Sequence, residues 1–272
     1  MKFKLIATAA LVTFAAVGSA TAADLGAPAP NYYKAPPPPP PPVYTFTGCY
    51  IAGGGGYGFW TQDSFARVNA TGTQLTNNVT NGGKGWFGMG QAGCDYEFNM
   101  PLPLFGWSPR LVIGAFGDWD GGQLDGTNSV GVTVGNERNS SAWFAGGRLG
   151  YVVNPRFMTY VSGGWTQARF DQVNYGSAVL PPVATFVPFS LAATTYNGWF
   201  IGSGFEYSLD ILPISGLFLK TEFRYSQYGG NSGTSVPFIF TATGAPTGLS
   251  LNSQKSIEMV STELVWRFNF FR

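Results

Sequence analysis

Eight segments in which apolar and polar residues alternate place the strongest constraint on the fold of this chain. They cover residues 47–60, 85–98, 111–121, 141–153, 156–170, 196–209, 217–228 and 256–271. Each is long enough to cross a membrane as a tilted β-strand, which takes about 9 to 11 residues. Alternation of this kind is typical of strands with one face on lipid and the other in a lumen. The segments predict an all-β fold, an eight-stranded antiparallel up-and-down transmembrane β-barrel.

The connections between these segments alternate in length. Three are brief, namely residues 99–110, the Asn154-Pro155 turn and residues 210–216. Four are longer and rich in Gly, Asn, Ser and Thr, namely residues 61–84, 122–140, 171–195 and 229–255. Outer-membrane barrels have short periplasmic turns and long extracellular loops, so we expect these two roles here.

The N-terminal residues predict export. Residues 1–22 combine a charged start, an apolar stretch and Ala20-Thr21-Ala22, which is the pattern of a secretory signal peptide. Residues 23–46 contain seven consecutive prolines, which favour a stiff polyproline II rod. We expect a periplasmic spacer there, or alternatively a docking site for a periplasmic partner. Residues 47–272 then form one outer-membrane barrel of a Gram-negative bacterium.

Composition argues against several functions. Only 11% of the residues are charged and 16% are aromatic, the reverse of a soluble surface. The formal net charge of +1 becomes −1 without the two leader lysines, which gives no electrostatic case for nucleic-acid binding. The chain has no histidine, the usual general base and a common metal ligand. We therefore expect no enzymatic activity, no catalytic or metal site and no cofactor.

The parity of the charged residues predicts which face lines the lumen, since alternate residues point to lipid and to the interior. Lys220, Glu222 and Arg224 share one parity in residues 217–228, for example. In residues 156–170 the parity is ambiguous, because Tyr160 and Trp165 lie on opposite faces. The predicted lumen charge network comprises Asp95, Glu97, Asp118, Arg148, Glu206, Lys220, Glu222, Arg224, Glu263 and Arg267, and Asp120 shares the face of Asp118.

Registers inferred from the turns bring opposite charges together. Centring the 210–216 turn on residue 213 places Glu206 opposite Lys220, and a similar centring of the last loop brings Glu263 near Lys220. The interior of an eight-stranded barrel is just wide enough for side chains to fill it. Paired charges therefore predict a plugged lumen, with a narrow or gated ion path as the alternative.

Large aromatic residues lie near the segment ends, where outer-membrane barrels carry aromatic girdles. The ends beside the long connections have Trp60, Trp86, Trp119, Trp143, Trp199 and Tyr228, and the ends beside the turns have Tyr50, Tyr96, Tyr151 and Tyr207. We expect both sets at the two membrane interfaces.

The two cysteines raise the question of a disulfide. Folding residues 47–60 and 85–98 about the centre of their loop makes Cys49 and Cys94 near-opposite neighbours. An oxidising compartment favours the bond, but a one-residue shift in register would put the two side chains on opposite faces. The sequence leaves both a disulfide and two free thiols open.

Two of the long connections are unusually apolar for exposed loops. One contains Val173, Val179, Leu180, Val183, Phe186, Val187, Phe189 and Leu191, and the other contains Val236, Phe238, Ile239 and Phe240. Strands that extend beyond the bilayer with loops packed on each other would explain them, and so would a hydrophobic mouth for an extracellular ligand or partner.

Several motifs resemble a known family, the small outer-membrane β-barrel proteins of alphaproteobacteria, called immunogenic or porin-family proteins and related in architecture to the OmpA transmembrane domain. The resemblance rests on residues 22–25, 32–36, 47–51, Gly85-Trp86, 90–93 and 113–119, together with the aromatic last segment. It implies an abundant envelope protein, sometimes called a porin, with a structural and surface-interaction role.

The chain departs from this family at four positions. Cys49 and Cys94 stand where the family usually has aromatics, and Phe116 replaces its usual glutamate, which weakens a polar lumen path. The chain ends in Arg272 rather than in the Phe that resembles an assembly signal, so recognition by the outer-membrane assembly machinery would use Leu264, Trp266, Phe268 and Phe270. Three functions therefore remain in view, namely a structural barrel in contact with outer-membrane lipids, a small channel or carrier for small or hydrophobic solutes, and an adhesin-like binding module.

Overall fold

The computed structural model describes residues 45–101, 108–177, 187–209, 215–230 and 232–268. The chain divides between Pro41 and Pro42, and all described residues belong to the second unit. The predicted leader, the proline run and the last four residues lie outside the described residues, as do residues 178–186 of the first apolar connection.

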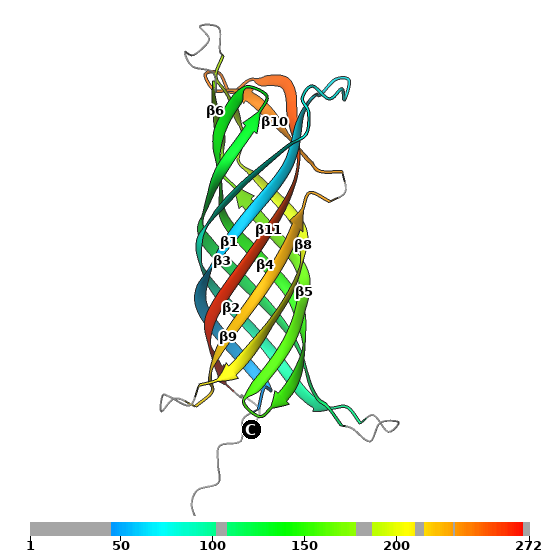
Figure 1. The fold of residues 1–272 in the computed structure, drawn as a ribbon, viewed down its shortest axis with the longest axis vertical. Helices are drawn as coiled ribbons and strands as arrows, with labels where there is room; N and C mark the ends of the chain where they lie inside the picture. Colours follow the sequence, from blue (N-terminus) through cyan, green and yellow to red (C-terminus); the bar gives the residue numbers. More distant parts are fainter. Residues whose placement is uncertain (1–44, 102–107, 178–186, 210–214, 231, 269–272) are drawn as a thin grey trace, which may run out of the picture. The chain divides into compact units, whose positions relative to one another are not determined.

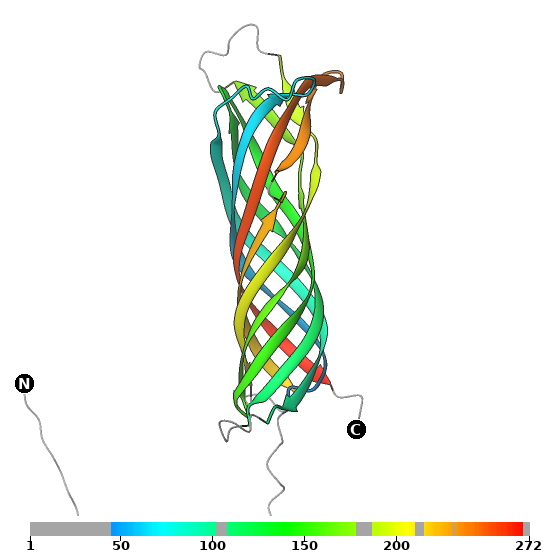
Figure 2. The same cartoon turned by 90° about the vertical axis from the view of Figure 1, so that its right-hand side faces the viewer.

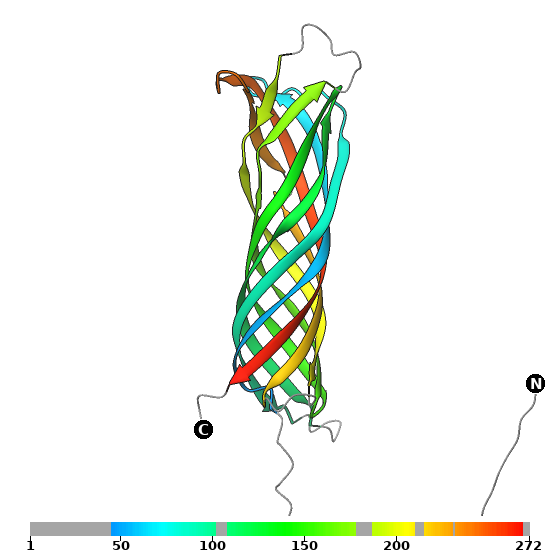
Figure 3. The ribbon, with the colours of Figure 1, turned by 90° about the vertical axis from the view of Figure 1, so that its left-hand side faces the viewer.

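Eight antiparallel strands form a ring (Figures 1, 2 and 3). They are β1 (Gly48–Val68), β2 (Val79–Asn99), β3 (Arg110–Val130), β4 (Thr133–Asn154), β5 (Phe157–Phe170), β8 (Thr194–Ser208), β9 (Leu217–Tyr228) and β11 (Pro246–Phe268). Each pairs with the next, and β11 pairs with β1 over nearly the whole length of β1. This confirms the predicted all-β up-and-down fold, and the described residues contain no helix.

Three shorter strands extend the ring at one end, which carries the labels β6 and β10 in Figure 1. They are β6 (Val173–Ser177), β7 (Phe189–Leu191) and β10 (Thr234–Phe240). β6 pairs with β4, β7 with β6, and β10 with both β7 and β11. They continue β5, β8 and β9, so the strands of the ring have neighbours well beyond the eight predicted segments. We call this the extended end, and the opposite end, where β4 meets β5, the turn end.

The long connections were therefore predicted too long. Residues 122–140 were expected to form a loop, but β3 and β4 run through them and leave only Gly131 and Val132 between the strands. β1 likewise continues to Val68, and β11 begins at Pro246. The physical reason is that the outward residues of these strand extensions, such as Asp125, Thr127 and Asn136, are polar, so their composition resembles that of a loop.

Inward and outward residues alternate along the ring as the pleat of a strand requires. In β5, Met158 and Tyr160 are buried inside, whereas Val161 and Trp165 are exposed outside, which resolves the ambiguous parity. The interior combines aromatic side chains with charged ones. Among the described residues, no helix is long and apolar enough to cross a membrane.

Candidate functional site: the charged lumen

Four charged residues meet near the turn end, and we call them the turn-end cluster: Asp95, Arg148, Glu206 and Arg267. Arg267 donates to both carboxylate oxygens of Glu206, from Nε at 2.7 Å and from Nη2 at 2.8 Å. Its Nη1 donates to Asp95 Oδ2 at 2.7 Å, and Arg148 Nε donates to Asp95 Oδ1 at 2.8 Å. Arg148 also lies 3.3 Å from Glu206. Two cations and two anions from β2, β4, β8 and β11 thus close a neutral ring across the lumen.

Phe46 and Tyr50 complete this cluster. The Phe46 carbonyl accepts a hydrogen bond from Arg267 at 2.9 Å, and its ring lies 5.4 Å from that of Phe218. Because Phe46 is fully buried, it belongs to the barrel and not to the spacer to which residues 23–46 were assigned. The Tyr50 ring lies below both guanidinium groups, 4.6 Å from Arg148 and 5.0 Å from Arg267, a cation–π arrangement.

A second group of charges lies further along the lumen. We call it the central cluster, formed by Asp118, Lys220, Glu222, Arg224 and Glu263. Lys220 Nζ lies 3.1 Å from Glu263 and 3.2 Å from Glu222. Arg224 lies 3.0 Å from Asp118 and 3.3 Å from Glu222. All five side chains are buried, so each charge depends on its partners in place of water.

Neutral polar side chains make the remaining hydrogen bonds of the charged groups. Glu222 accepts hydrogen bonds from Ser162 at 2.6 Å and from Tyr160 at 3.0 Å. Gln91 accepts from Lys220 at 2.6 Å and donates to Asp118 at 2.8 Å. The Tyr50 hydroxyl donates to the same Gln91 at 3.2 Å, which links the central cluster to the turn-end cluster.

Three phenylalanine rings surround the Arg224 guanidinium. Its central carbon lies 4.4 Å from the centre of Phe144, 4.9 Å from Phe200 and 5.8 Å from Phe116. Phe116 is buried inside the lumen. Its apolar ring therefore fills space beside the Arg224 guanidinium.

A third ion pair, Lys255–Glu137, lies towards the extended end. Lys255 Nζ is 2.7 Å from Glu137, and it also donates to Gln62. Asn128 donates to Glu137 at 2.8 Å. The rings of Phe170, Trp60 and Tyr196 surround the ammonium group at 4.1, 5.1 and 5.1 Å. The sequence reasoning missed this pair, because it treated residues 122–140 and 229–255 as loops.

Asp120 is buried on the lumen face beside the central cluster, yet neither of its carboxylate oxygens has a hydrogen-bond partner among the described residues. It is the exception to the pairing that the other lumen carboxylates show. Glu97 also faces inward, but at the rim of the turn end, where its side chain is 11% exposed and pairs with Arg110. It therefore shares the predicted lumen face without joining the ion pairs of the turn-end cluster.

The inferred registers agree with the strand pairing. Glu206 lies opposite Lys220 in β8–β9, and Glu263 lies opposite Lys220 in β9–β11. Lys220 nevertheless pairs with Glu222 and Glu263, while Glu206 pairs with the arginines. Cys49 lies opposite Cys94 in β1–β2, and a disulfide joins them.

The outside of the ring carries two belts of aromatic residues. The belt towards the extended end contains Tyr57, Trp86, Trp119, Trp143, Trp165, Trp199 and Tyr225. The belt at the turn end contains Tyr96, Phe98, Tyr151, Phe157, Tyr207, Trp266 and Phe268. Exposed aliphatic side chains lie between the belts, among them Ile113, Val161, Ile201 and Leu264.

Three predicted girdle residues are not in these belts. Tyr50, Trp60 and Tyr228 are at most 1% exposed and face the lumen, so their assignment to the membrane interfaces is wrong. Trp60 Nε1 donates to the Leu124 carbonyl at 3.0 Å, and the Tyr228 hydroxyl lies 3.0 Å from Thr166 Oγ1. Position along a strand does not reveal which way an aromatic side chain points, whereas parity does.

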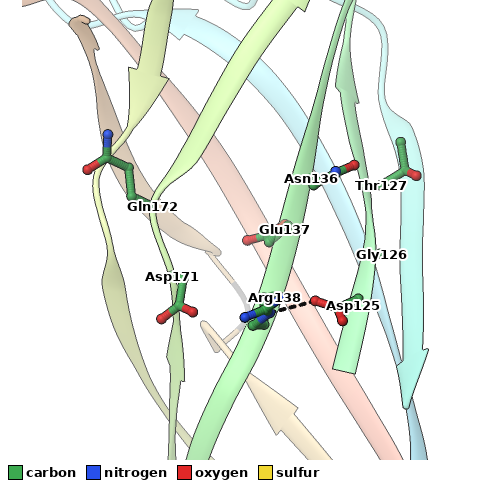
Figure 4. Close-up of a pocket in the computed structure, with 8 residues that line it drawn as sticks. All are labelled: Asp125, Gly126, Thr127, Asn136, Glu137, Arg138, Asp171 and Gln172. Atoms are coloured by element: carbon green, nitrogen blue, oxygen red, sulfur yellow. Dashed lines mark hydrogen bonds and ion pairs between the residues drawn. The ribbon is translucent and has the colours of Figure 1, made fainter. Parts of the chain in front are cut away.

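A polar hollow of about 660 Å³ lies outside the ring near the extended end (Figure 4). It is lined by Asp125, Gly126, Thr127, Asn136, Glu137, Arg138, Asp171 and Gln172. Arg138 donates to Asp125 at 2.6 Å, the interaction dashed in Figure 4. Among the described residues, no group of three or more His, Cys, Asp or Glu side chains is arranged to hold a metal ion.

No family model and no curated relative matches the chain. Among solved structures it is similar to the outer-membrane protease OmpT of Escherichia coli, with a TM-score of 0.41, 10% identity and coverage of 80% of this chain and 97% of that one. The attachment invasion locus protein Ail of Yersinia pestis gives a TM-score of 0.31 and 10% identity over 79% and 99% of the two chains. The outer-membrane protein OprG of Pseudomonas aeruginosa gives 0.33 and 11% over 82% and 97%. These neighbours are outer-membrane β-barrels with different roles, and at such scores the likeness carries no argument about function.

Proposed function

We propose that this chain is a non-enzymatic outer-membrane β-barrel that stabilises the envelope with a closed lumen and presents its extended end outside the cell. The two aromatic belts support the membrane location. Eleven residues run from Trp86 to Tyr96 in β2, and nine run from Trp199 to Tyr207 in β8. These lengths match the roughly 9 to 11 residues of a tilted transmembrane strand. The extended end then faces outward and the turn end faces the periplasm.

The observation that carries the functional proposal is the ionic crosslinking of the lumen. The turn-end cluster joins β2, β4, β8 and β11, and the central cluster joins β3, β9 and β11. Moving any one of these side chains aside would leave a buried charge of its cluster uncompensated, which costs several kcal/mol. Such a network favours a plug over an open path for ions.

The chemistry of the lumen also favours a non-enzymatic role. A catalytic carboxylate needs access to a substrate, whereas the carboxylates of the two clusters are buried and bound to arginine or lysine. Histidine, which most often serves as general base, is absent from the sequence. The proposed partners are outer-membrane lipids around the belts and the assembly machinery, for which the outward Leu264, Trp266 and Phe268 of β11 form the recognition surface.

Planar-bilayer recording tests the closed lumen. We expect the wild-type protein to show no reproducible unit conductance. The double variant Arg148→Ala, Arg267→Ala removes both cations of the turn-end cluster and should admit water and ions. Arg138→Ala, in an exposed ion pair outside the ring, is the matched control and should stay silent. Steady unit conductance of the folded wild-type protein would overturn the closed-lumen proposal and favour a small channel.

The extended end supports a surface-interaction role. The ring of paired strands continues past the outer belt through β6, β7 and β10, so the exposed surface there is built on sheet. The polar hollow of Figure 4 adds charged side chains of both signs, Asp125 and Asp171 with Arg138. This arrangement suits presentation of a rigid surface better than passage of a solute.

A further inference from the structure

An apolar pocket opens at the extended end, and we call it the mouth pocket. Its volume is about 340 Å³. Nine residues from β1, β3, β7, β10, β11 and the β1–β2 connection line it: Ala66, Leu75, Thr76, Val130, Phe189, Phe238, Phe240, Thr247 and Leu249. None of them is charged, and only the two threonines carry a polar side chain.

Aromatic rings form one wall of this pocket. The rings of Phe189 and Phe238 lie 5.2 Å apart, edge to face. Tyr175 supports both from behind, with ring centres 5.1 Å from Phe189 and 5.8 Å from Phe238. Burial raises the pKa of the Tyr175 hydroxyl, and the Glu137 carboxylate adds to the shift, so the phenol stays neutral. The wall is therefore aromatic and uncharged.

Side chains close the pocket towards the membrane. The next inward residues along the same strands, Leu191, Val236 and Leu251, are almost completely buried. Beyond them lies the Lys255–Glu137 pair. At the opposite side, among the described residues, the rim is exposed, with Leu75 53% exposed and Phe240 37% exposed. A molecule could thus enter from outside, but the filled lumen leaves it no onward route.

We propose that the mouth pocket binds a neutral hydrophobic small molecule of about two aromatic rings. Its volume is roughly twice that of the 150 Å³ apolar cavity that accommodates benzene. A charged ligand would lose its hydration without gaining a partner, which excludes ions from an uncharged pocket. The polar hollow makes the contrast clear, because it offers Asp125, Arg138 and Asp171 to a charged ligand.

Exposure of the rim supports a ligand over simple core packing. Large apolar side chains gathered around a concavity and left open to water mark binding sites more often than structural surfaces. Because their apolar side chains are exposed to water, Leu75 and Phe240 contribute little to the stability of the fold. A ligand in the pocket would cover both. Ligand binding in the mouth pocket goes beyond the proposed structural role of the barrel and does not depend on it.

Methyl NMR of the full barrel in lipid nanodiscs tests this site, with naphthalene as the probe. Lipid also takes up naphthalene, so the readout must be local. We expect the methyl signals of Leu75, Val130 and Leu249 to shift and saturate, while those of the lipid-facing Leu264 and Val161 shift in proportion to added probe. The charged analogue naphthalene-2-sulfonate should leave the three pocket signals unchanged. Equal, unsaturable shifts at all five residues would overturn the proposal.

Two variants separate binding from folding. Ala66→Phe fills the pocket, and Leu75→Glu places a charge on an exposed rim position where the fold tolerates it. Each should weaken the saturable component at least about tenfold, which corresponds to about 1.4 kcal/mol. Val132→Glu is the matched control, since Val132 is exposed near the same end but does not line the pocket. Unchanged binding in folded Leu75→Glu protein would sink the assignment, whatever the bilayer recordings show about conductance.

Discussion

Between the two aromatic belts the barrel is apolar outside and ionic inside, whereas beyond the outer belt its outside is polar and its inside combines apolar with neutral polar side chains. Val161, Ile201 and Leu264 face outward between the belts, and the charged clusters lie behind them. Past the outer belt, Thr80, Arg138 and Asn174 face outward, while Val173, Phe238 and Leu251 face inward. One strand pattern therefore serves two opposite environments.

The surroundings of each region determine what its interior contains. Lipid requires a largely apolar exterior, so a charged residue of the membrane region must point inward and find a partner there. Water does not require an apolar exterior, so the extended end can bury its apolar residues as a soluble sheet does. The Lys255–Glu137 pair marks the transition, since it is an ion pair enclosed by aromatic rings.

The largest effect should follow loss of Arg267. Arg267→Ala leaves Glu206 and Asp95 to share Arg148 in a buried site, which we expect to lower the free energy of unfolding by about 3 to 5 kcal/mol. Urea titration of the protein folded into vesicles measures it. Arg138→Ala removes an exposed ion pair of the extension and should leave the midpoint unchanged. Equal effects of the two variants would contradict the distinction between the two regions.

Loss of Lys255 should cost about 3 kcal/mol, the lower end of the range for a broken buried pair, because Asn128 still donates to Glu137. The double variant Lys255→Met, Glu137→Leu should recover stability to within about 1 kcal/mol of wild type, since both side chains then suit the surrounding rings. The same urea titration measures the single and double variants. If the double variant is no more stable than Lys255→Met, the loss of stability does not come from an unpaired Glu137, and this prediction is wrong.

An arginine on the outer surface should distinguish the two regions directly. Val161 lies midway between the belts in β5, so Val161→Arg should cost about 2 kcal/mol in lipid vesicles. Val134, which is outward and exposed in the extension, is the matched position, and Val134→Arg should change stability by less than about 0.5 kcal/mol. A comparable loss at both positions would mean that the extension also lies in lipid.

The membrane region could be predicted from the sequence because its chemistry is constrained on both faces. Charge parity located the lumen positions, and the short turn centred on residue 213 gave the β8–β9 register. Charge parity could also have placed Tyr50, Trp60 and Tyr228 in the lumen. Tyr228 has the parity of Arg224, and the Cys49–Cys94 register carries the lumen parity of Asp95 over to Tyr50.

The strands of the extended end were not predicted, because in water neither the apolar alternation nor the parity of charged residues is constrained. Residues 122–140 are polar on the outside and contain few long apolar side chains, so their alternation is hidden. The three-dimensional partners of the lumen ions were also beyond the sequence. Glu206 lies opposite Lys220 but pairs with Arg267, because side chains reach across the barrel and not only to the adjacent strand.

The smallest effect tests whether the extension behaves as an independent part. Gly131 begins the two-residue turn between β3 and β4 with a φ of 59°, which a residue with a Cβ rarely adopts. Gly131→Ala should cost about 1 kcal/mol although a Cβ there would meet open space. Gly90→Ala is the matched control, because Gly90 also has room for a Cβ but is not among the glycines of positive φ, so no cost is expected. Hydrogen exchange should become faster only near Val130 and Thr133 in Gly131→Ala, since the strain is local. Faster exchange at Phe116 or Leu149, between the belts, would show instead that the extension and the membrane region unfold as one unit.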